Sequence, residues 1–344
     1  MSSKYADDKG EYLKHLTRSK DISEILSRNG GERYLSYRKK WNLASQRKDY
    51  YKVPVQLDID ITNVCNMACH HCNAITYGPD MDKKIIKDHI DMELLKKRLK
   101  EAIPLGVDSI NFGNGSEPLI TKNELFELID LGKELGVTDV FLHTNGLLLE
   151  GERAERILSS GVTVLCVSLD AFYEKTFNKI GRKNYSKVVK NINDFRELRD
   201  RAGQELPILR VSYLPTIHNY EEVPEFVKYW ESRVDKAELQ SIFDLDPEKS
   251  GIKDTSAFEK MPFDCSDPWK RLPIWPNNTY GVCCQYYSYD AGSKFNLGSL
   301  NDFSIEEVWN SEQMQNIRRA LEGEGQNKEC QECMANTYCL ADHG

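Results

Sequence analysis

The sequence predicts an α/β fold built on a parallel, barrel-like sheet, followed by a small cysteine-rich domain. Between about Val53 and Phe243, apolar stretches of strand length alternate with amphipathic stretches of helix length, as in successive βα units. Six such units form an incomplete version of the eight-stranded barrel. We therefore expect a partial (β/α)6 barrel, similar to a TIM barrel, whose reactive edge lies at the carboxyl ends of the strands.

The expected elements follow one another in chain order. Strands are predicted at Val53–Ile61, Asp108–Phe112, Asp139–His143, Thr163–Leu169, Ile208–Leu214 and Ala237–Phe243. Helices are predicted at Met92–Ala102, Asn123–Leu135, Gly151–Ser159, Tyr185–Arg199 and Val223–Ser232.

The length of 344 residues allows one large domain and a small one. Strand-like periodicity stops near Asp246–Phe258, where charged and small residues dominate. We expect an N-terminal helical extension over residues 1–50, the barrel over residues 51–246 and the cysteine-rich domain over residues 247–344.

Alternation within the strands predicts a polar interior for the barrel. Side chains on one face of a barrel strand pack beneath the helices, and those on the other face point into the lumen. The residues that alternate with apolar ones are Gln56, Asp58 and Asp60 in the first strand, Cys166, Ser168 and Asp170 in the fourth, and Arg210 and Ser212 in the fifth. Because bulky apolar side chains fill a closed eight-stranded barrel, this pattern favours an open barrel that holds a cofactor and a substrate. An ordinary α/β sheet with polar strand ends is the alternative.

The formal net charge of −8 argues against bulk binding to nucleic acid or to an anionic membrane surface. The N-terminus does not resemble a signal peptide, and no run approaches the ~20 apolar residues that span a bilayer. We therefore expect a cytoplasmic protein with no nucleic-acid or membrane partner. In the cytosol, the ten cysteines are better explained as metal ligands than as disulfides.

Three cysteines directly follow the first predicted strand, at the reactive edge of the barrel. Cys65, Cys69 and Cys72 have the spacing Cys-x3-Cys-x2-Cys. A [4Fe–4S] cluster has four irons, so three thiolates leave one iron open for a substrate or cofactor. This motif resembles the signature of the radical S-adenosylmethionine (SAM) enzymes. The resemblance implies a [4Fe–4S] cluster whose open iron binds SAM, reductive cleavage of SAM to a 5'-deoxyadenosyl radical, and removal of a hydrogen atom from the substrate. His70 and His71 leave a zinc site as the alternative.

The turn over residues 113–118 closes the second predicted strand. It resembles the glycine-rich, Glu-Pro-ended turn that binds the amino group of SAM in this family, which implicates Gly113, Gly115 and Glu117. Asn114 and Ser116 depart from the plainer sequence of the family, so the contact of Glu117 is better supported than the backbone contacts.

Further cofactor contacts are expected on the same side of the barrel. Asn145 follows the third strand, and the resemblance places Ser168 and Arg210 near the methionyl carboxylate of SAM and its neighbouring polar groups. The alternative for Arg210 is that it neutralises Asp170 or Asp58, because an unpaired buried charge is costly.

A second group of cysteines follows the predicted domain boundary. Its members are Cys265, Cys283, Cys284, Cys330, Cys333 and Cys339. Four thiolates close a cluster with no open iron. The group resembles the auxiliary iron–sulfur domain called twitch, and the spacing from Cys330 to Cys339 resembles that of the larger SPASM domain. Because only residues 340–344 follow Cys339, we expect one auxiliary [4Fe–4S] cluster held by Cys265, Cys283, Cys330 and Cys333, in which Cys284 or Cys339 can replace one ligand. Zinc is the alternative metal.

Residues for proton or hydrogen transfer are predicted in the lumen. Asp58, Asp60, His143 and Glu238 are candidate bases. Cys284 is the candidate thiol that returns a hydrogen atom to a substrate radical. Cys166 is a weaker candidate, because a small buried cysteine is often only a core filler, and Cys339 is a third.

The sequence thus predicts an enzyme that oxidises or epimerises a sugar, an aminocyclitol or a similar small molecule. An auxiliary cluster can accept the electron that remains after hydrogen abstraction and proton loss, which favours oxidation. The electron donor is expected to be a reducing protein such as flavodoxin or ferredoxin. The alternatives are a peptide maturase that forms a thioether, a carbon–carbon crosslink or an epimer, and a non-catalytic zinc-binding interaction module.

Overall fold

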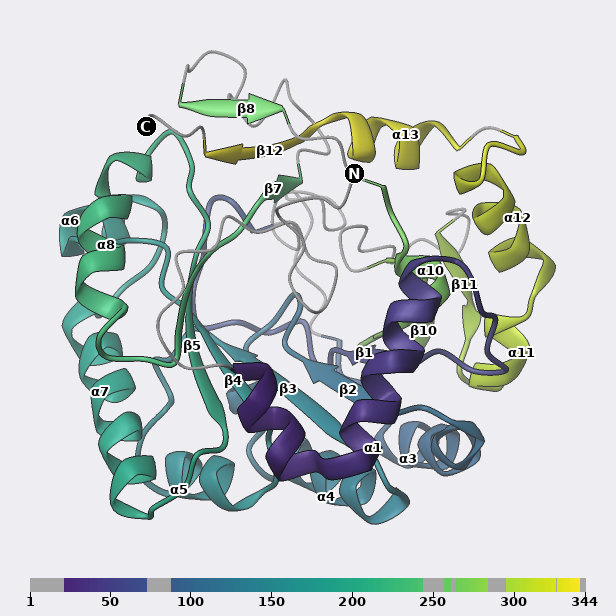
Figure 1. The fold of residues 1–344 in the computed structure, drawn as a ribbon, viewed down its shortest axis with the longest axis horizontal. Coiled ribbons are helices and arrows are strands. Elements are labelled where there is room, and N and C mark those ends of the chain that lie inside the picture. Colours follow the sequence, from purple (N-terminus) through teal and green to yellow (C-terminus); the bar gives the residue numbers. More distant parts are fainter. Residues whose placement is uncertain are drawn as a thin grey trace.

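The computed structural model describes residues 22–72, 88–243, 257–260, 264–283, 295–325 and 327–340 (Figure 1). Within these ranges, a nine-stranded sheet has the strand order β11-β10-β9-β1-β2-β3-β4-β5-β6. Six neighbouring strands in it are parallel: β1 (Gln56–Ile59), β2 (Ser109–Phe112), β3 (Asp139–Thr144), β4 (Val164–Ser168), β5 (Ile208–Tyr213) and β6 (Lys236–Leu239). These are the six predicted strands, and no pairing between β6 and β11 closes the sheet in the described part of the chain. The predicted α/β fold with an incomplete barrel is therefore confirmed.

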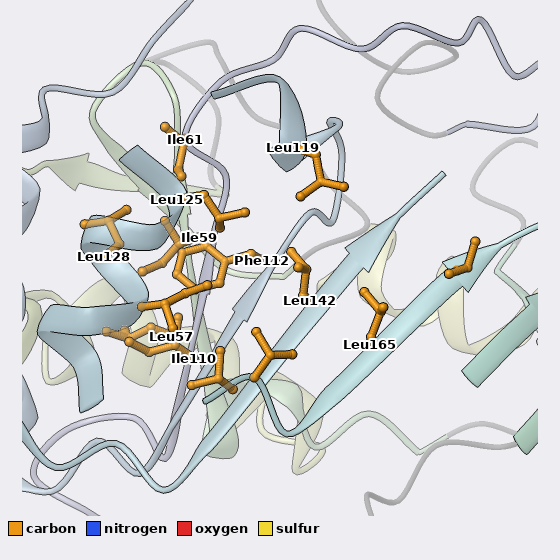
Figure 2. Packing of buried hydrophobic residues seen from close by; sticks show 14 of the residues in the cluster. Leu57, Ile59, Ile61, Ile110, Phe112, Leu119, Leu125, Leu128, Leu142 and Leu165 are labelled. Atoms are coloured by element: carbon orange, nitrogen blue, oxygen red, sulfur yellow. The ribbon is translucent and has the colours of Figure 1, made fainter. Parts of the chain in front are cut away.

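The helices that cover the outer face of the sheet begin and end close to the predicted residues. They are α3 (Met92–Ala102), α4 (Asn123–Leu135), α5 (Gly151–Ser159), α7 (Tyr185–Arg201) and α8 (Val223–Trp230), with the short α6 (Glu174–Lys179) before α7. Their apolar residues form one core with alternate strand residues. Figure 2 shows part of this core, where Leu125 and Leu128 of α4 lie close to Ile59 of β1 and Phe112 of β2.

The last predicted strand, Ala237–Phe243, is divided in the structure. The parallel ladder ends where the amide of Gln240 donates a hydrogen bond to the carbonyl of Tyr213, the last residue of β5. Since the neighbouring strand stops there, the chain leaves the sheet, and β7 (Ile242–Phe243) joins a second sheet of order β7-β12-β8. The other two strands of that sheet are β8 (Phe258–Lys260) and β12 (Thr337–Leu340).

The N-terminal helix α1 (Ile22–Ser45) packs on the inner face of the open sheet (Figure 1). A second apolar cluster joins its aromatic residues to residues at the amino ends of the strands. Its members include Tyr34, Tyr37 and Trp41 from α1, and Val55, Phe141, Val164 and Ile208 from the sheet side. α1 bends at Gly31, whose φ of 58° is a conformation that favours glycine. The helix therefore closes the end of the open barrel opposite the reactive edge.

The C-terminal region continues the main sheet. β9 (Arg271–Trp275) pairs in parallel with β1, and β10 (Thr279–Gly281) and β11 (Asn296–Ser299) extend the sheet in antiparallel fashion. The helices of this region are α10 (Asp267–Lys270), α11 (Ile305–Trp309), α12 (Glu312–Leu321) and α13 (Lys328–Ala335). The limits of the three predicted parts of the chain stay predictions. No helix within the described ranges has the length and apolar character to cross a membrane.

Candidate functional site

The three-cysteine loop follows β1 at the carboxyl edge of the parallel strands. Cys69 is buried, Cys72 is half-buried and Cys65 is exposed. The amide of Ala68 donates a 3.1 Å hydrogen bond to the carbonyl of Gly181. The amide of His70 donates another, also of 3.1 Å, to the carbonyl of Ile180. The cysteine loop thus lies directly on the segment after α6.

Gly181 makes this close approach possible. Its φ is +86°, and a Cβ at this position would lie 2.0 Å from the carbonyl oxygen of Ala68. Any other residue would push the cysteine loop away or strain the backbone. The glycine therefore allows the loop that carries the three thiols to pack directly on this segment.

The three thiols fit an iron–sulfur cluster as a donor set. Thiolates are soft ligands of the kind that such clusters use, and in a cubane each one binds a different iron. A zinc site instead needs its donors about 2.3 Å from a single ion, and no three His, Cys, Asp or Glu side chains of the described residues converge in that way. Burial raises the pKa of Cys69 to about 12, so binding of a metal group there releases a proton.

Asn145 lies beside the cysteine loop, as expected for a cofactor-side residue. Its side-chain amide donates to Oδ1 of Asn66 at 2.6 Å and lies 3.8 Å from Sγ of Cys65. Hydrogen bonds to cluster sulfurs are one means by which a protein sets a reduction potential. The contact supports a role for Asn145, which stays a prediction.

Glu117 is fully buried and its carboxylate has several partners. It accepts hydrogen bonds from the backbone amide of Asn145 at 2.7 Å, from Oγ1 of Thr144 at 2.9 Å and from the amide of Leu119 at 3.0 Å. Burial raises the pKa of Glu117, and these hydrogen bonds oppose that shift. The carboxylate thus joins the turn after β2 to the turn after β3, and its predicted contact with SAM stays untested.

Asp60 organises the glycine-rich turn. Its Oδ1 accepts from the amide of Asn114 at 3.0 Å, from the amide of Gly115 at 3.4 Å and from Oγ of Ser116 at 3.3 Å. Gly113 has a φ of +89°, and a Cβ there would lie 2.5 Å from the carbonyl oxygen of His143. Close approach of the neighbouring strand therefore explains this glycine, and contact of the turn with SAM stays a prediction.

Asp58, a predicted base, is fully buried on the inner face. Its Oδ1 accepts from the side-chain amides of Gln56 at 2.6 Å and Asn111 at 3.1 Å, and its Oδ2 lies 3.7 Å from a guanidinium nitrogen of Arg271. Asn111 also donates to Oδ1 of Asn114 at 2.9 Å. Asp58 is therefore the centre of a polar network that reaches the glycine-rich turn.

Glu238, another predicted base, forms buried ion pairs with Arg210 and, at 2.9 Å, with Lys236. Burial raises the pKa of Glu238, but the two positive charges outweigh this effect and hold it at about 2. Such a carboxylate is a weak base near neutral pH. The predicted alternative that Arg210 neutralises Asp170 or Asp58 is corrected, because its ion-pair partner among the described residues is Glu238. The register of β5 and β6 places Arg210 beside Lys236, close to Glu238.

His143, Cys166 and Arg210 are register neighbours across β3, β4 and β5. The half-buried His143 ring stacks near Phe141, with 6.2 Å between the ring centroids. At the ends of β4 and β5, Oγ of Ser212 donates to Oγ of Ser168 at 3.5 Å. The predicted inner-face residues are thus brought to one side of the sheet.

Arg182 is a site residue that the sequence interpretation missed. It forms a buried ion pair with Asp170, and one guanidinium nitrogen donates to the carbonyl of Ser168 at 2.5 Å. Nε2 of His71 lies 3.3 Å from the same Asp170 carboxylate. Since Arg182 lies in a loop outside any recognised motif, its only sequence signal was its place directly after Gly181.

Three predicted auxiliary ligands, Cys265, Cys330 and Cys333, are close enough to affect one another's pKa. Burial raises the pKa of Cys265 well above its usual value and that of Cys333 to about 12, and the adjacent Cys330 raises both further. Cys330 lies in the first turn of α13, whose N-cap Asn327 accepts a hydrogen bond from its amide at 3.1 Å. The predicted ligand set stays a prediction.

Cys283 and Cys339 are the other described cysteines of the second group. Cys283 is half-buried just after β10. Cys339 is in β12, where its Sγ lies 3.7 Å from Oε1 of Glu259. Cys284, the predicted thiol donor, falls outside the described residues.

Two family models match the chain. That of the radical SAM superfamily matches residues 59–229, and that of SPASM, an iron–sulfur cluster-binding domain, matches residues 265–334. The first match includes the strands from β2 to β5, and the second includes every cysteine of the second group except Cys339.

Curated relatives resemble part of the chain. A probable GTP 3',8-cyclase of Methanocaldococcus jannaschii is 28% identical over 197 residues, which cover 57% of this chain and 61% of the relative. A GTP 3',8-cyclase of Rhizobium etli is 30% identical over 182 residues, which cover 52% of this chain and 48% of the relative. The chain therefore spans about half the length of the curated relatives that it matches.

Solved structures share the fold. Streptococcus suis SuiB bound to its precursor peptide SuiA has a TM-score of 0.62 and 14% identity over 88% of this chain and 74% of SuiB. The anSMEcpe structure with bound AdoMet has a TM-score of 0.56 and 16% identity, with 81% and 86% covered. BtrN in complex with AdoMet and 2-DOIA has a TM-score of 0.50 and 16% identity, with 83% and 94% covered.

Proposed function

Because this chain belongs to the radical SAM superfamily and carries a SPASM-type iron–sulfur region, we propose that it oxidises or epimerises a hydroxylated small molecule. Cys65, Cys69 and Cys72 would hold the [4Fe–4S] cluster that binds SAM. When bound, the cluster and SAM supply the radical that removes a hydrogen atom from the substrate. The protein supplies the rest: it orients the substrate, excludes water and moves protons.

A set of buried polar atoms on the inner face carries this proposal. Oδ2 of Asp58, Oδ1 of Asn111 and Nδ2 of Asn114 are buried without a hydrogen-bond partner among the described residues. The three side chains belong to one network. Oδ2 of Asp58 faces Arg271 at 3.7 Å, which is beyond hydrogen-bond distance. Because buried polar groups without a hydrogen bond are costly, such a set supports a ligand that completes it. Two acceptors and one donor suit neutral hydroxyl groups, which can both donate and accept.

The inner face also limits which residue can act as a base. Asp58 and Glu238 lie beside positive charges, and Glu238 has a pKa of about 2. His143 is half-buried on the same face. We therefore propose His143 as the proton acceptor in preference to Glu238, because the two positive charges beside Glu238 make its carboxylate a weak base and imidazole is a common general base.

In the C-terminal region, we propose that Cys265, Cys283, Cys330 and Cys333 hold one auxiliary cluster. After oxygen-free reconstitution, the parent should then contain about eight irons per chain, and a triple Cys65→Ala, Cys69→Ala, Cys72→Ala variant about four. Zinc in place of the residual iron would overturn the auxiliary cluster and leave the radical chemistry without that electron acceptor.

The activity is tested by formation of 5'-deoxyadenosine from SAM under reducing, oxygen-free conditions, with sugars and aminocyclitols supplied as substrates in deuterated water. Solvent deuterium at a carbon supports epimerisation through a thiol donor, whereas a two-electron loss supports oxidation. Absence of 5'-deoxyadenosine in a protein that holds its full iron would reject the enzyme. Zinc in place of iron at both cysteine groups would favour the zinc-module alternative.

The substrate contact is tested by an Asn111→Ala variant. It should raise KM for the accepted substrate at least tenfold, whereas Asn193→Ala in the outer helix α7 should not. An unchanged KM in Asn111→Ala would place the substrate elsewhere.

Two other substrate classes have specific support. The likeness to SuiB, which covers 88% of this chain, favours a peptide. The similarity to GTP 3',8-cyclases favours a purine nucleotide, although it covers about half of this chain. A precursor-type peptide and GTP therefore belong in the same assay, and turnover of either one in place of the sugars would replace the small-polyol proposal.

A further inference from the structure

We propose that Arg182 is a positioning residue that raises the reduction potential of the SAM-binding cluster, by holding a buried positive charge beside the three-cysteine loop. The inference rests on the proposed function, since it requires a cluster at Cys65, Cys69 and Cys72. It adds a residue of another segment to that site.

The position of Arg182 is fixed by the backbone around it. Its neighbours Ile180 and Gly181 accept hydrogen bonds from the amides of His70 and Ala68, both of 3.1 Å. The amide of Arg182 itself donates to the carbonyl of Phe177 at 3.1 Å. The cysteine loop and Arg182 are therefore parts of one hydrogen-bonded unit.

The guanidinium is buried and oriented by β4. Arg182 is 7% exposed, and it bonds both the carboxylate of Asp170 and the carbonyl of Ser168. Asp170 is itself fixed, because its other oxygen accepts a 2.8 Å hydrogen bond from the amide of Leu214. The planar fork of arginine suits such a two-point attachment, and it stays charged at all ordinary pH values.

The ion pair of Arg182 and Asp170 lies beside the cysteine loop. Nε2 of His71, the residue before Cys72, lies 3.3 Å from the Asp170 carboxylate that pairs with Arg182. A positive charge close to a cluster stabilises the added electron of its reduced form, so it raises the reduction potential.

This arrangement predicts shifts of opposite sign for the two partners. Arg182→Gln removes the positive charge and leaves Asp170 as an unbalanced negative charge, so the potential should fall. Asp170→Asn leaves Arg182 unbalanced, so the potential should rise. In Arg182→Gln/Asp170→Asn both charges are gone, and the potential should return toward that of the parent. Arg182→Lys keeps the charge and should retain most of the potential.

The experiment is an oxygen-free redox titration of the intact, reconstituted chain, followed by electron paramagnetic resonance. The SAM-binding cluster is identified as the signal that changes when SAM is added. We expect each single neutralisation to shift its reduction equilibrium at least tenfold, which is about 59 mV for a one-electron couple. Iron content and thermal unfolding of each variant show whether its fold and its loading are retained.

The outcomes separate this inference from the proposed function. If the parent shows no SAM-dependent signal, the proposed function fails. If the parent shows it and both neutralising variants keep the parental potential, or shift it in the same direction, only the role of Arg182 is rejected. Should Arg182→Gln fail to load its cluster, the predicted rise in Asp170→Asn still decides the matter.

Discussion

The backbone amide of Asn145 donates a 2.7 Å hydrogen bond to the buried carboxylate of Glu117, and this bond joins the turns that follow two neighbouring parallel strands. Asn145 also contacts the cysteine loop through Asn66. A carboxylate predicted to bind the cofactor directly therefore supports the loop that would hold the cluster.

Glu117→Gln should destabilise the protein even without SAM. The carboxylate of Glu117 accepts hydrogen bonds from two backbone amides and a hydroxyl group. The NH2 group of glutamine cannot accept, so at least one of these buried donors loses its partner. The expected loss of unfolding free energy is about 2 kcal/mol, measured by urea denaturation of the SAM-free protein. If Glu117 instead acts only through SAM, the variant will lose SAM affinity and keep the parental stability.

Gly181→Ala should abolish loading of the cluster at Cys65, Cys69 and Cys72. The added methyl group meets the carbonyl of Ala68, so the loop must move. Gly203→Ala is the matched control: its φ is also positive, at +66°, but nothing lies within 4 Å of the added Cβ. The control should lose about 1 kcal/mol of stability and keep its iron. The iron content is measured by chemical analysis. Equal iron retention in the two variants would show that close packing at Gly181 is not needed for cluster loading.

Glu238 should make stability depend on pH in the acid range. The positive charges of Arg210 and Lys236 hold its pKa near 2, against an ordinary value of 4.5, so the unfolded chain binds its proton first as pH falls. The stabilisation is therefore present above pH 4.5 and is lost as pH falls toward 2. Glu238→Gln should flatten this part of the stability curve, measured by urea denaturation at several pH values. Glu155→Gln, at an exposed position on α5, should leave the curve unchanged.

Trp41→Ala should unfold the closed end of the barrel. The indole is fully buried between α1 and the inner face, so its loss should lower the unfolding free energy by about 3–5 kcal/mol. Leu35→Ala on the same helix, where the leucine is 55% exposed, should change it by less than about 0.5 kcal/mol. Similar losses in both variants would show that α1 contributes through its helical structure alone.

The fold was largely predictable because its signals are local. α3, α4 and α5 have the predicted bounds, because amphipathic periodicity marks each helix. Local signals also mark two of the helix ends: Asp91 caps the start of α3, and Gly136 ends α4 in the left-handed conformation. The inner-face residues followed from alternation in the strands.

The remaining features depend on contacts between distant segments. No local pattern indicates that β9 pairs with β1, or that α1 packs on the inner face. The Arg210–Glu238 pair depends on the register of β5 and β6, which the sequence of either strand alone does not specify. Arg182 was missed for the same reason, since its importance comes from the loop that folds onto it.

The parallel pairing of β9 with β1 has a practical consequence for anyone who wishes to divide this protein. A chain cut before Arg271 would leave the backbone of β1 unpaired along one side, next to the fully buried Leu57 and Ile59. Exposed apolar strand edges recruit other chains. We therefore expect the isolated radical SAM part to precipitate or to exchange strands between copies. In the intact chain, β9 of the SPASM-type region covers this edge of the sheet.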